Sequence, residues 1–269
     1  MASPRFCSQR ARAHAHATDA NAIAGTATEA AHWLLVEDPA PWGRKPLKET
    51  AWYPDVKGAI ARWKQVIPDV RVQLIRRGLK TWDTPEGIRC FVIRAGRRPV
   101  VHARTIPAYD ALSTLDVPRL LQEAPAASVS EAPASEGVLP DAPLVLTCTN
   151  GRRDACCAKW GRPVAQAARA AHPGGAWQSS HLGGHRFAPT TLVVPSGAHY
   201  GWLSPGDMAG LVQAHRNGRL YDLSRYRGRV SHPRPVQAAC IDLRKRRSLD
   251  ALNAVEGARL ERPPSESPE

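Results

Sequence analysis

Long apolar runs are missing from this 269-residue sequence. No stretch approaches the roughly 18 consecutive apolar residues that a membrane-spanning helix needs. The N-terminal 25 residues also lack the apolar segment of a secretory signal peptide. We therefore expect a protein with no membrane partner that works in the cytoplasm. Hydrophobic residues still make up 43% of the chain, which is enough to build globular cores.

A disulfide framework is also missing. The chain has six cysteines, and Cys156 and Cys157 are adjacent, which opposes a bond between them. We expect reduced thiols. The sequence contains no carboxylate pair, no phosphate-binding glycine loop and no nucleophile triad. These absences favour an electron carrier or a binding module over a stand-alone enzyme.

Acidic residues are few relative to basic ones. Lys and Arg number 37 against 24 Asp and Glu, so the net charge is +13. Such an excess favours an acidic protein partner or nucleic acid. A chain rich in Ala, Arg and Pro is also typical of a GC-rich genome, and charge alone does not name a partner. A nucleic-acid partner is not expected.

The apolar patterns predict the same order of elements twice: strand, helix, strand, strand, strand, helix. In the first half we expect strands at 31–38, 70–76, 88–95 and 99–106, with helices at 54–65 and 117–123. In the second half we expect strands at 143–148, 176–181, 190–195 and 198–203, with helices at 162–171 and 205–215, the latter capped by Ser204. Pro163 would then lie in the first turn of its helix.

The predicted fold class is α/β, with two related α/β units in tandem. Their proposed boundaries are 1–25 for a mobile leader, 26–123 for the first unit, 124–142 for a Pro/Ala/Ser linker, 143–232 for the second unit, and 233–269 for a basic, partly disordered tail.

The segment from Cys148 to His185 carries a candidate metal site. It offers thiolates at Cys148 and Cys157, nine positions apart, and imidazoles at His181 and His185, four positions apart. Two sulfur and two nitrogen ligands suit zinc or an iron-sulfur cluster. The glycines between the histidines oppose a helix and predict a tight loop that brings both rings to one metal. Cys156 is an alternative ligand to Cys157, and a buried structural thiol is the alternative role for either cysteine.

Three functions fit these residues. The first is a redox protein with a cluster. The second is a zinc-stabilised structural or nucleic-acid-binding module, although eight residues separate the cysteines, whereas a zinc finger has two to four. The third is a thiol oxidoreductase using Cys156 and Cys157, which is the weakest because the pair is not Cys-x-x-Cys. Cys7, Cys90 and Cys240 are isolated in sequence and are interpreted as small buried or spare thiols.

Three longer motifs resemble the sucrase/ferredoxin-like family: CTNGRRDACCAKWGRPVA, SSHLGGHRFAPTTLVVPSGAHYGWLSPGD and HWLLVEDPAPWGR. The resemblance runs from about Cys7 to Val230 and implies that the second unit is a thioredoxin-like ferredoxin domain. In the family's bis-histidinyl members a Cys-x8-Cys pair and a His-x3-His pair hold a 2Fe-2S cluster, and these motifs fall on Cys148, Cys157, His181 and His185.

The resemblance has further implications. The first half resembles a thioredoxin-like unit without cluster ligands, and Pro189 is a candidate for the cis-proline that such folds often place near the site. No sucrose-cleaving activity is implied. The basic tail departs from the family pattern, so its role is open.

The implied ligands predict the redox chemistry. Two imidazoles in place of two thiolates make a cluster less negative and raise its potential. Exposed imidazoles also gain a proton on reduction, so the potential should fall as pH rises. Near the ligands, Arg152, Arg153 and Arg186 would offset charge or dock an unknown, acidic redox partner, and Asp154 would orient a ligand histidine or cap a turn.

Overall fold

The computed structural model describes residues 6–18, 22–78, 87–122 and 143–255. The α helices are α1 (Cys7–Thr18), α2 (Pro46–Glu49), α3 (Tyr53–Val66), α4 (Val117–Gln122), α5 (Ala155–Ala171), α6 (Asp207–Arg216) and α7 (Arg234–Arg247), and the 3-10 helices are η1 (Tyr109–Thr114) and η2 (His185–Phe187). The strands are β1 (His32–Glu37), β2 (Arg71–Arg76), β3 (Ile88–Arg94), β4 (Val100–Ile106), β5 (Leu144–Cys148), β6 (Ala176–Ser179), β7 (Thr191–Val194), β8 (Ala198–Tyr200) and β9 (Tyr226–Arg229). The predicted α/β class is confirmed.

The strands form a nine-stranded mixed sheet in the order β4-β3-β1-β2-β6-β5-β7-β8-β9. Within each half the first strand pairs parallel with the second and antiparallel with the third. The halves join where β2 pairs antiparallel with β6, through Ile75 opposite Ser179 and Arg76 opposite Gln178. The two halves therefore meet edge to edge at their second strands, and one sheet runs through both.

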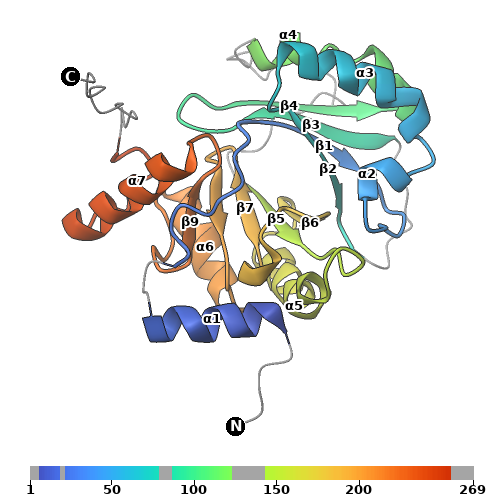
Figure 1. The fold of residues 1–269 in the computed structure, drawn as a ribbon. Helices are drawn as coiled ribbons and strands as arrows, with labels where there is room; N and C mark the ends of the chain where they lie inside the picture. The colour runs from blue at the N-terminus through green and yellow to red at the C-terminus, as the bar shows by residue number, and fades with distance from the viewer. Residues whose placement is uncertain (1–5, 19–21, 79–86, 123–142, 256–269) are drawn as a thin grey trace, which may run out of the picture.

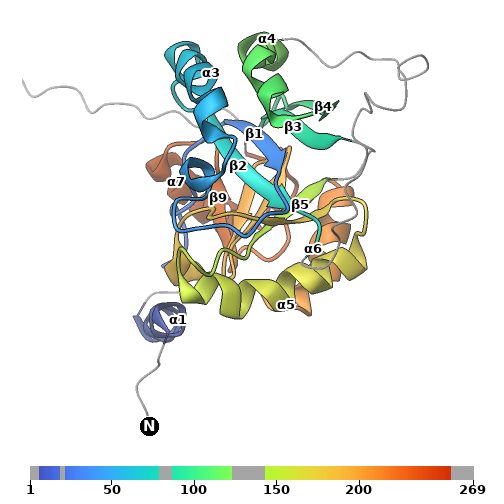
Figure 2. The same ribbon diagram turned by 90° about the vertical axis from the view of Figure 1, so that its right-hand side faces the viewer.

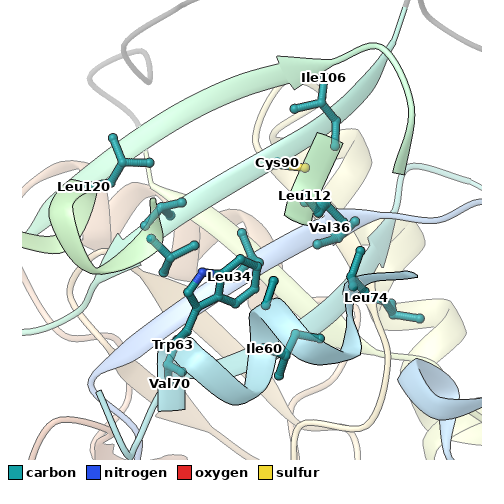
Figure 3. Packing of buried hydrophobic residues seen from close by; sticks show 14 of the residues in the cluster. Leu34, Val36, Ile60, Trp63, Val70, Leu74, Cys90, Ile106, Leu112 and Leu120 are labelled. Atoms are coloured by element: carbon teal, nitrogen blue, oxygen red, sulfur yellow. The ribbon is translucent and has the colours of Figure 1, made fainter. Parts of the chain in front are cut away.

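The first half packs its sheet against α3 and α4, which lie together on one side of the molecule (Figures 1 and 2). The buried side of α3 carries Val56, Ala59, Ile60 and Trp63, at the three- and four-residue spacing predicted for 54–65. These side chains meet Leu34 and Val36 of β1 and Cys90 of β3 (Figure 3). Cys90 is thus a core residue, as the sequence predicts.

A second core links the two halves. Because side chains alternate across a strand, Trp33 and Leu35 of β1 face away from Leu34 and Val36. They belong to a cluster that also contains Leu144, Leu146 and Cys148 of β5. The end of β5 therefore lies in apolar surroundings built by both halves of the chain.

Helix α5 begins earlier than predicted. The helix expected at 162–171 starts at Ala155, and Pro163 lies inside it rather than in its first turn. Asp154 sets the true start, because its side chain accepts a hydrogen bond from the backbone N–H of Cys156, an N-cap worth about 1 kcal/mol. The cap predicted at Ser204 is also wrong: Gly206 is the N-cap of α6, while Asp207 accepts from Ser204.

A helix lies near each end of the described chain. Helix α1 contacts η2, and α1 and α5 lie on the side of the molecule opposite α3 and α4 (Figures 1 and 2). Helix α7, in the predicted basic tail, packs Val236, Cys240 and Ile241 inward next to β9. The predicted linker at 124–142 and the end of the tail from 256 lie outside the described residues. Within the described ranges, none of the helices combines the length and apolar character needed to cross a bilayer.

Candidate metal centre

Cys148 is the last residue of β5. It lies on the same side of the strand as Leu144 and Leu146, and its side chain is fully buried. Helix α5 approaches this strand end closely at Gly161, where an added Cβ would stand 2.0 Å from the carbonyl oxygen of Cys148. Only glycine permits this approach, which holds the first turns of α5 against the end of β5.

Cys156 and Cys157 lie in the first turn of α5, since this helix starts before the predicted residue 162. Asp154 Oδ1 accepts from the N–H of Cys156 over 2.8 Å, and the Asp154 carbonyl accepts from the N–H of Cys157 over 3.1 Å. Both thiols are buried, with Cys157 in the core shared with Cys148. Cys156 Sγ lies instead 3.2 Å from Cys7 Sγ, so the two adjacent thiols have different neighbours.

The histidines flank the glycine loop that the sequence predicts. Gly183 and Gly184 have φ angles of +97° and +74°, in the left-handed region that side chains rarely adopt. An added Cβ would stand 2.7 Å from Thr28 Oγ1 at the first glycine and 2.5 Å from Arg227 Nη2 at the second. Both conformation and space therefore require glycine here.

Side chains distant in sequence hold this loop by its carbonyl groups. Arg71 Nη2 donates to His181 O over 3.1 Å, Thr28 Oγ1 donates to Leu182 O over 2.7 Å, and Arg227 Nη1 donates to Gly183 O over 3.1 Å. Arg227 is almost fully buried, and this burial lowers its pKa to about 9. Three successive carbonyls are thus fixed, which limits where the histidine rings can go.

Three of the four predicted ligands converge. His181 Nδ1 lies 3.6 Å from Cys157 Sγ and 3.9 Å from Cys148 Sγ, and the three donor atoms all lie within 4.8 Å of one another. A hydrogen bond from Cys157 lowers the pKa of Cys148, and the neighbouring His181 lowers it further. The same bond, together with burial, raises the pKa of Cys157. The pair therefore holds one thiolate readily, a starting point for metal binding.

The fourth predicted ligand faces a different set of groups. His185 begins η2, and its ring centroid lies 6.4 Å from that of His181. Its Nδ1 lies 3.0 Å from Asp154 Oδ2 and 3.2 Å from Cys7 Sγ, and its side chain is 49% exposed. Asp154 thus both caps α5 and contacts a predicted ligand histidine, so it has both of the roles offered for it by the sequence.

The three arginines predicted to lie beside the ligands are at the protein surface. Arg152, Arg153 and Arg186 are exposed, and the guanidinium of Arg186 stacks 4.6 Å from the ring centroid of Phe187. Pro189 follows a cis peptide bond, as does Pro195.

Sequence analysis missed Cys7 and Arg71. Cys7 Sγ contacts both Cys156 and His185, and partial burial, followed by the hydrogen bond with Cys156, raises the pKa of Cys7 to about 11. Arg71 is partly buried, and this desolvation lowers its pKa, while the nearby Cys148 opposes that shift. No local pattern points to either residue, because each reaches the site across more than 75 positions of sequence.

The sulfur and nitrogen donors of this group determine which metals it can bind. Two thiolates and an imidazole that converge at a buried strand end, with a second imidazole on the same tight loop, fit zinc or a 2Fe-2S cluster with mixed ligands. Hard cations such as Mg²⁺ fit poorly, because they prefer oxygen ligands. The arrangement can therefore hold a structural zinc ion or a one-electron redox centre.

Comparison with known proteins assigns the chain to a family. A family model described as sucrase/ferredoxin-like matches residues 23–228, well over half of the chain. No curated protein and no solved structure matches the chain significantly. The match contains all four predicted ligands and the loops that carry them, in agreement with the resemblance seen in the motifs. The chain belongs to the sucrase/ferredoxin-like family.

Proposed function

We propose that this protein transfers electrons through a 2Fe-2S cluster held by Cys148, Cys157, His181 and His185. One observation carries the proposal: the donor atoms of Cys148, Cys157 and His181 lie within 4.8 Å of one another at a buried strand end, with His185 on the same glycine loop. Such a cluster, when bound, accepts and releases one electron.

The chain's own residues would tune that chemistry. The apolar surroundings of Cys148 exclude water from the thiolate side, while the partly buried guanidinium of Arg71 offsets negative charge there. The half-exposed ring of His185 is the group placed to exchange a proton with solvent. Proton-coupled electron transfer is therefore the activity we infer.

We further infer that the two halves are thioredoxin-like units and that the redox partner is acidic. The first four strands of each half pair in the same way, with β9 and α7 added in the second half, and this shared pairing supports a common architecture. Arg152, Arg153 and Arg186 are exposed cations beside the ligand loops, and the chain carries a net charge of +13. Such a surface attracts an acidic protein at long range.

The deciding experiment is the visible spectrum of protein purified without oxygen, with iron, sulfide and zinc assayed on the same sample. We expect a red-brown protein with equal iron and sulfide that is bleached by dithionite. A colourless protein with one zinc per chain would overturn the redox proposal.

A zinc-stabilised structural module is the second candidate. The mutual distances among Cys148, Cys157 and His181 are short enough for these three residues to bind a single ion, which favours it. In that case the free energy of unfolding should fall when a chelator removes zinc, and no one-electron couple should be found.

A further inference from the structure

A second group of metal-binding side chains lies beside the proposed cluster site. Cys7, Asp154 and His185 each offer a donor atom, and these atoms lie within 4.8 Å of one another. Cys7 comes from the start of α1, Asp154 from the N-cap of α5, and His185 from the start of η2. Three elements distant in sequence thus bring sulfur, oxygen and nitrogen to one place.

The distances match a small tetrahedral site. His185 Nδ1 lies 3.2 Å from Cys7 Sγ and 3.0 Å from Asp154 Oδ2. Ligands of tetrahedral zinc stand about 3.3–3.8 Å apart, given zinc bonds of about 2.0–2.3 Å. A second thiol, Cys156 Sγ, lies 3.2 Å from Cys7 Sγ but outside the group of three donor atoms, so it must move toward Asp154 or His185 to take a fourth position. The three donor atoms of the group lie close enough together to share one ion.

Asp154 has a separate oxygen for each of its two contacts. Oδ1 accepts from the backbone N–H of Cys156 and caps α5, whereas Oδ2 faces His185. The cap can therefore persist when Oδ2 binds a cation. The side chains of Asp154 and His185 are 24% and 49% exposed, so an ion can enter from solvent.

We propose that Cys7, Asp154 and His185, with Cys156 as fourth ligand, form a zinc site distinct from Cys148, Cys157 and His181. Binding displaces the thiol protons of Cys7 and Cys156 into solvent, and the two thiolates and the carboxylate then leave the occupied site with one net negative charge. That charge is favoured beside the N-terminus of α5. The ion would fasten α1 to the start of α5.

The site has one consequence that rests on the proposed function. His185 belongs to both ligand sets, so zinc bound at Cys7 withholds one cluster ligand. Zinc should then slow cluster assembly in cluster-free protein, and it should do so only when Cys7 is present.

The test uses full-length, cluster-free protein kept reduced, with Zn²⁺ titrated against a chromophoric chelator. In Cys148→Ser the other ligand set is broken, and we expect one tightly bound zinc per chain. Adding Cys7→Ser should remove it, while adding Cys240→Ser, a matched cysteine change in α7, should leave it. A folded Cys148→Ser protein that binds no zinc, or binding that survives Cys7→Ser, would overturn the proposal.

Two further measurements keep the test valid if Cys148→Ser fails to fold. In otherwise unmodified protein, Cys7→Ser should lower the zinc count by one and Zn²⁺ should protect Cys7 from alkylation; an unchanged count would overturn the proposal. Asp154→Asn retains a good N-cap but removes the carboxylate, and it should weaken this zinc site about 10–100-fold. Unchanged affinity in Asp154→Asn would remove Asp154 from the site.

The proposed zinc site and the proposed cluster can be rejected independently, because their rejection gives different metal contents. Iron and sulfide are assayed in Cys7→Ser after anaerobic reconstitution, since Cys7 is not a cluster ligand in our proposal. Normal iron and sulfide with an unchanged zinc count would reject the zinc site alone. Loss of one zinc with no cluster in any variant would reject the cluster alone.

Discussion

The two halves of the molecule share a four-strand arrangement but differ in the residues around the ends of their first strands. Directly after β1 the first half has Asp38, whose two oxygens accept from the N–H of Ala40 over 2.9 Å and from Trp52 Nε1 over 3.1 Å, beside a cavity of about 300 Å³. The second half has Cys148 as the last residue of β5, followed by a short loop and the two thiols of α5.

This difference shows which features distinguish the candidate metal centre. Strand order and parallel pairing do not select it, since both halves have them. Among the described residues, the glycine loop, the capped first turn of α5 and the cysteine at the strand end belong to the second half. The first half contributes a partly buried cation, Arg71, and part of the apolar surroundings of Cys148.

The largest expected difference is between removing a buried thiol from the second half and removing one from the first half. Cys148→Ala should abolish most of the bound iron, because it deletes a proposed cluster ligand. Cys90→Ala should keep the iron, because burial raises the pKa of Cys90 to about 12 and keeps it a protonated core thiol. Iron and sulfide assays on both variants check this. Equal iron loss in the two variants would contradict the assignment of ligands to the second half.

The next effect concerns the reduction potential. Reduction adds negative charge and raises the proton affinity of a histidine ligand, so the potential should fall as pH rises, by up to about 59 mV per pH unit for one proton and one electron. His185→Cys should lower the potential by on the order of 100 mV and flatten this slope. Redox titrations at several pH values test both. A wild-type potential independent of pH would exclude exposed histidine ligation.

A smaller effect, on the free energy of unfolding, is expected from a change in the glycine loop between His181 and His185. Gly184→Ala places a side chain at a φ of +74° and against Arg227, so it should lower the free energy of unfolding by about 1–2 kcal/mol. The matched change Gly174→Ala meets no atom within 4 Å and should stay within about 0.5 kcal/mol of the parent. Urea unfolding of both proteins measures the difference. Equal stabilities would show that the loop relaxes.

The smallest expected effect is a pH dependence of stability that arises from Asp38 in the first half. Burial raises the pKa of Asp38, outweighing the hydrogen bonds and the charge of Arg76 that lower it. The protonated form is therefore favoured by folding, and its contribution to stability is fully present below the unfolded-state pKa of about 3.8 and is lost as pH rises through the higher folded-state pKa.

Asp38→Asn cannot titrate, so the stability advantage of the parent over this variant should shrink as pH rises above 3.8. Unfolding curves at several pH values measure that difference, with iron content unchanged in both. A difference that grows with pH would mean that the pKa of Asp38 is lowered instead.

Much of the fold could be predicted from local patterns. The helix at 54–65 and the eight predicted strands follow from periodicity, and the structure contains them all; it adds β9, which the sequence did not predict. The predicted start of α5 is wrong because Pro163 lies inside the helix and not in its first turn. Asp154 is the local signal that identifies the true start, since aspartate is a preferred N-cap.

The candidate site was only partly predictable. The four ligands could be named from their spacing and from the family resemblance, and the glycine loop from its composition. The groups that hold the loop, Thr28, Arg71 and Arg227, could not be found, because each meets it through a contact distant in sequence. The same holds for Cys7, which lies 149 positions from Cys156.

The short pairing between β2 and β6 places residues of the first half next to His181. Ser180 makes two hydrogen bonds with the backbone of Leu74 in β2: its N–H donates to Leu74 O over 2.9 Å, and its side-chain Oγ accepts from Leu74 N over 3.1 Å. His181 follows directly and is held at its carbonyl by Arg71. In an isolated second half, β6 would be an unpaired edge strand that other chains could pair with. Only Ser180 would separate that edge from His181 and the glycine loop. Sequence changes around β2 are therefore expected to act at a distance on the second half, as changes in ligand placement rather than in ligand identity.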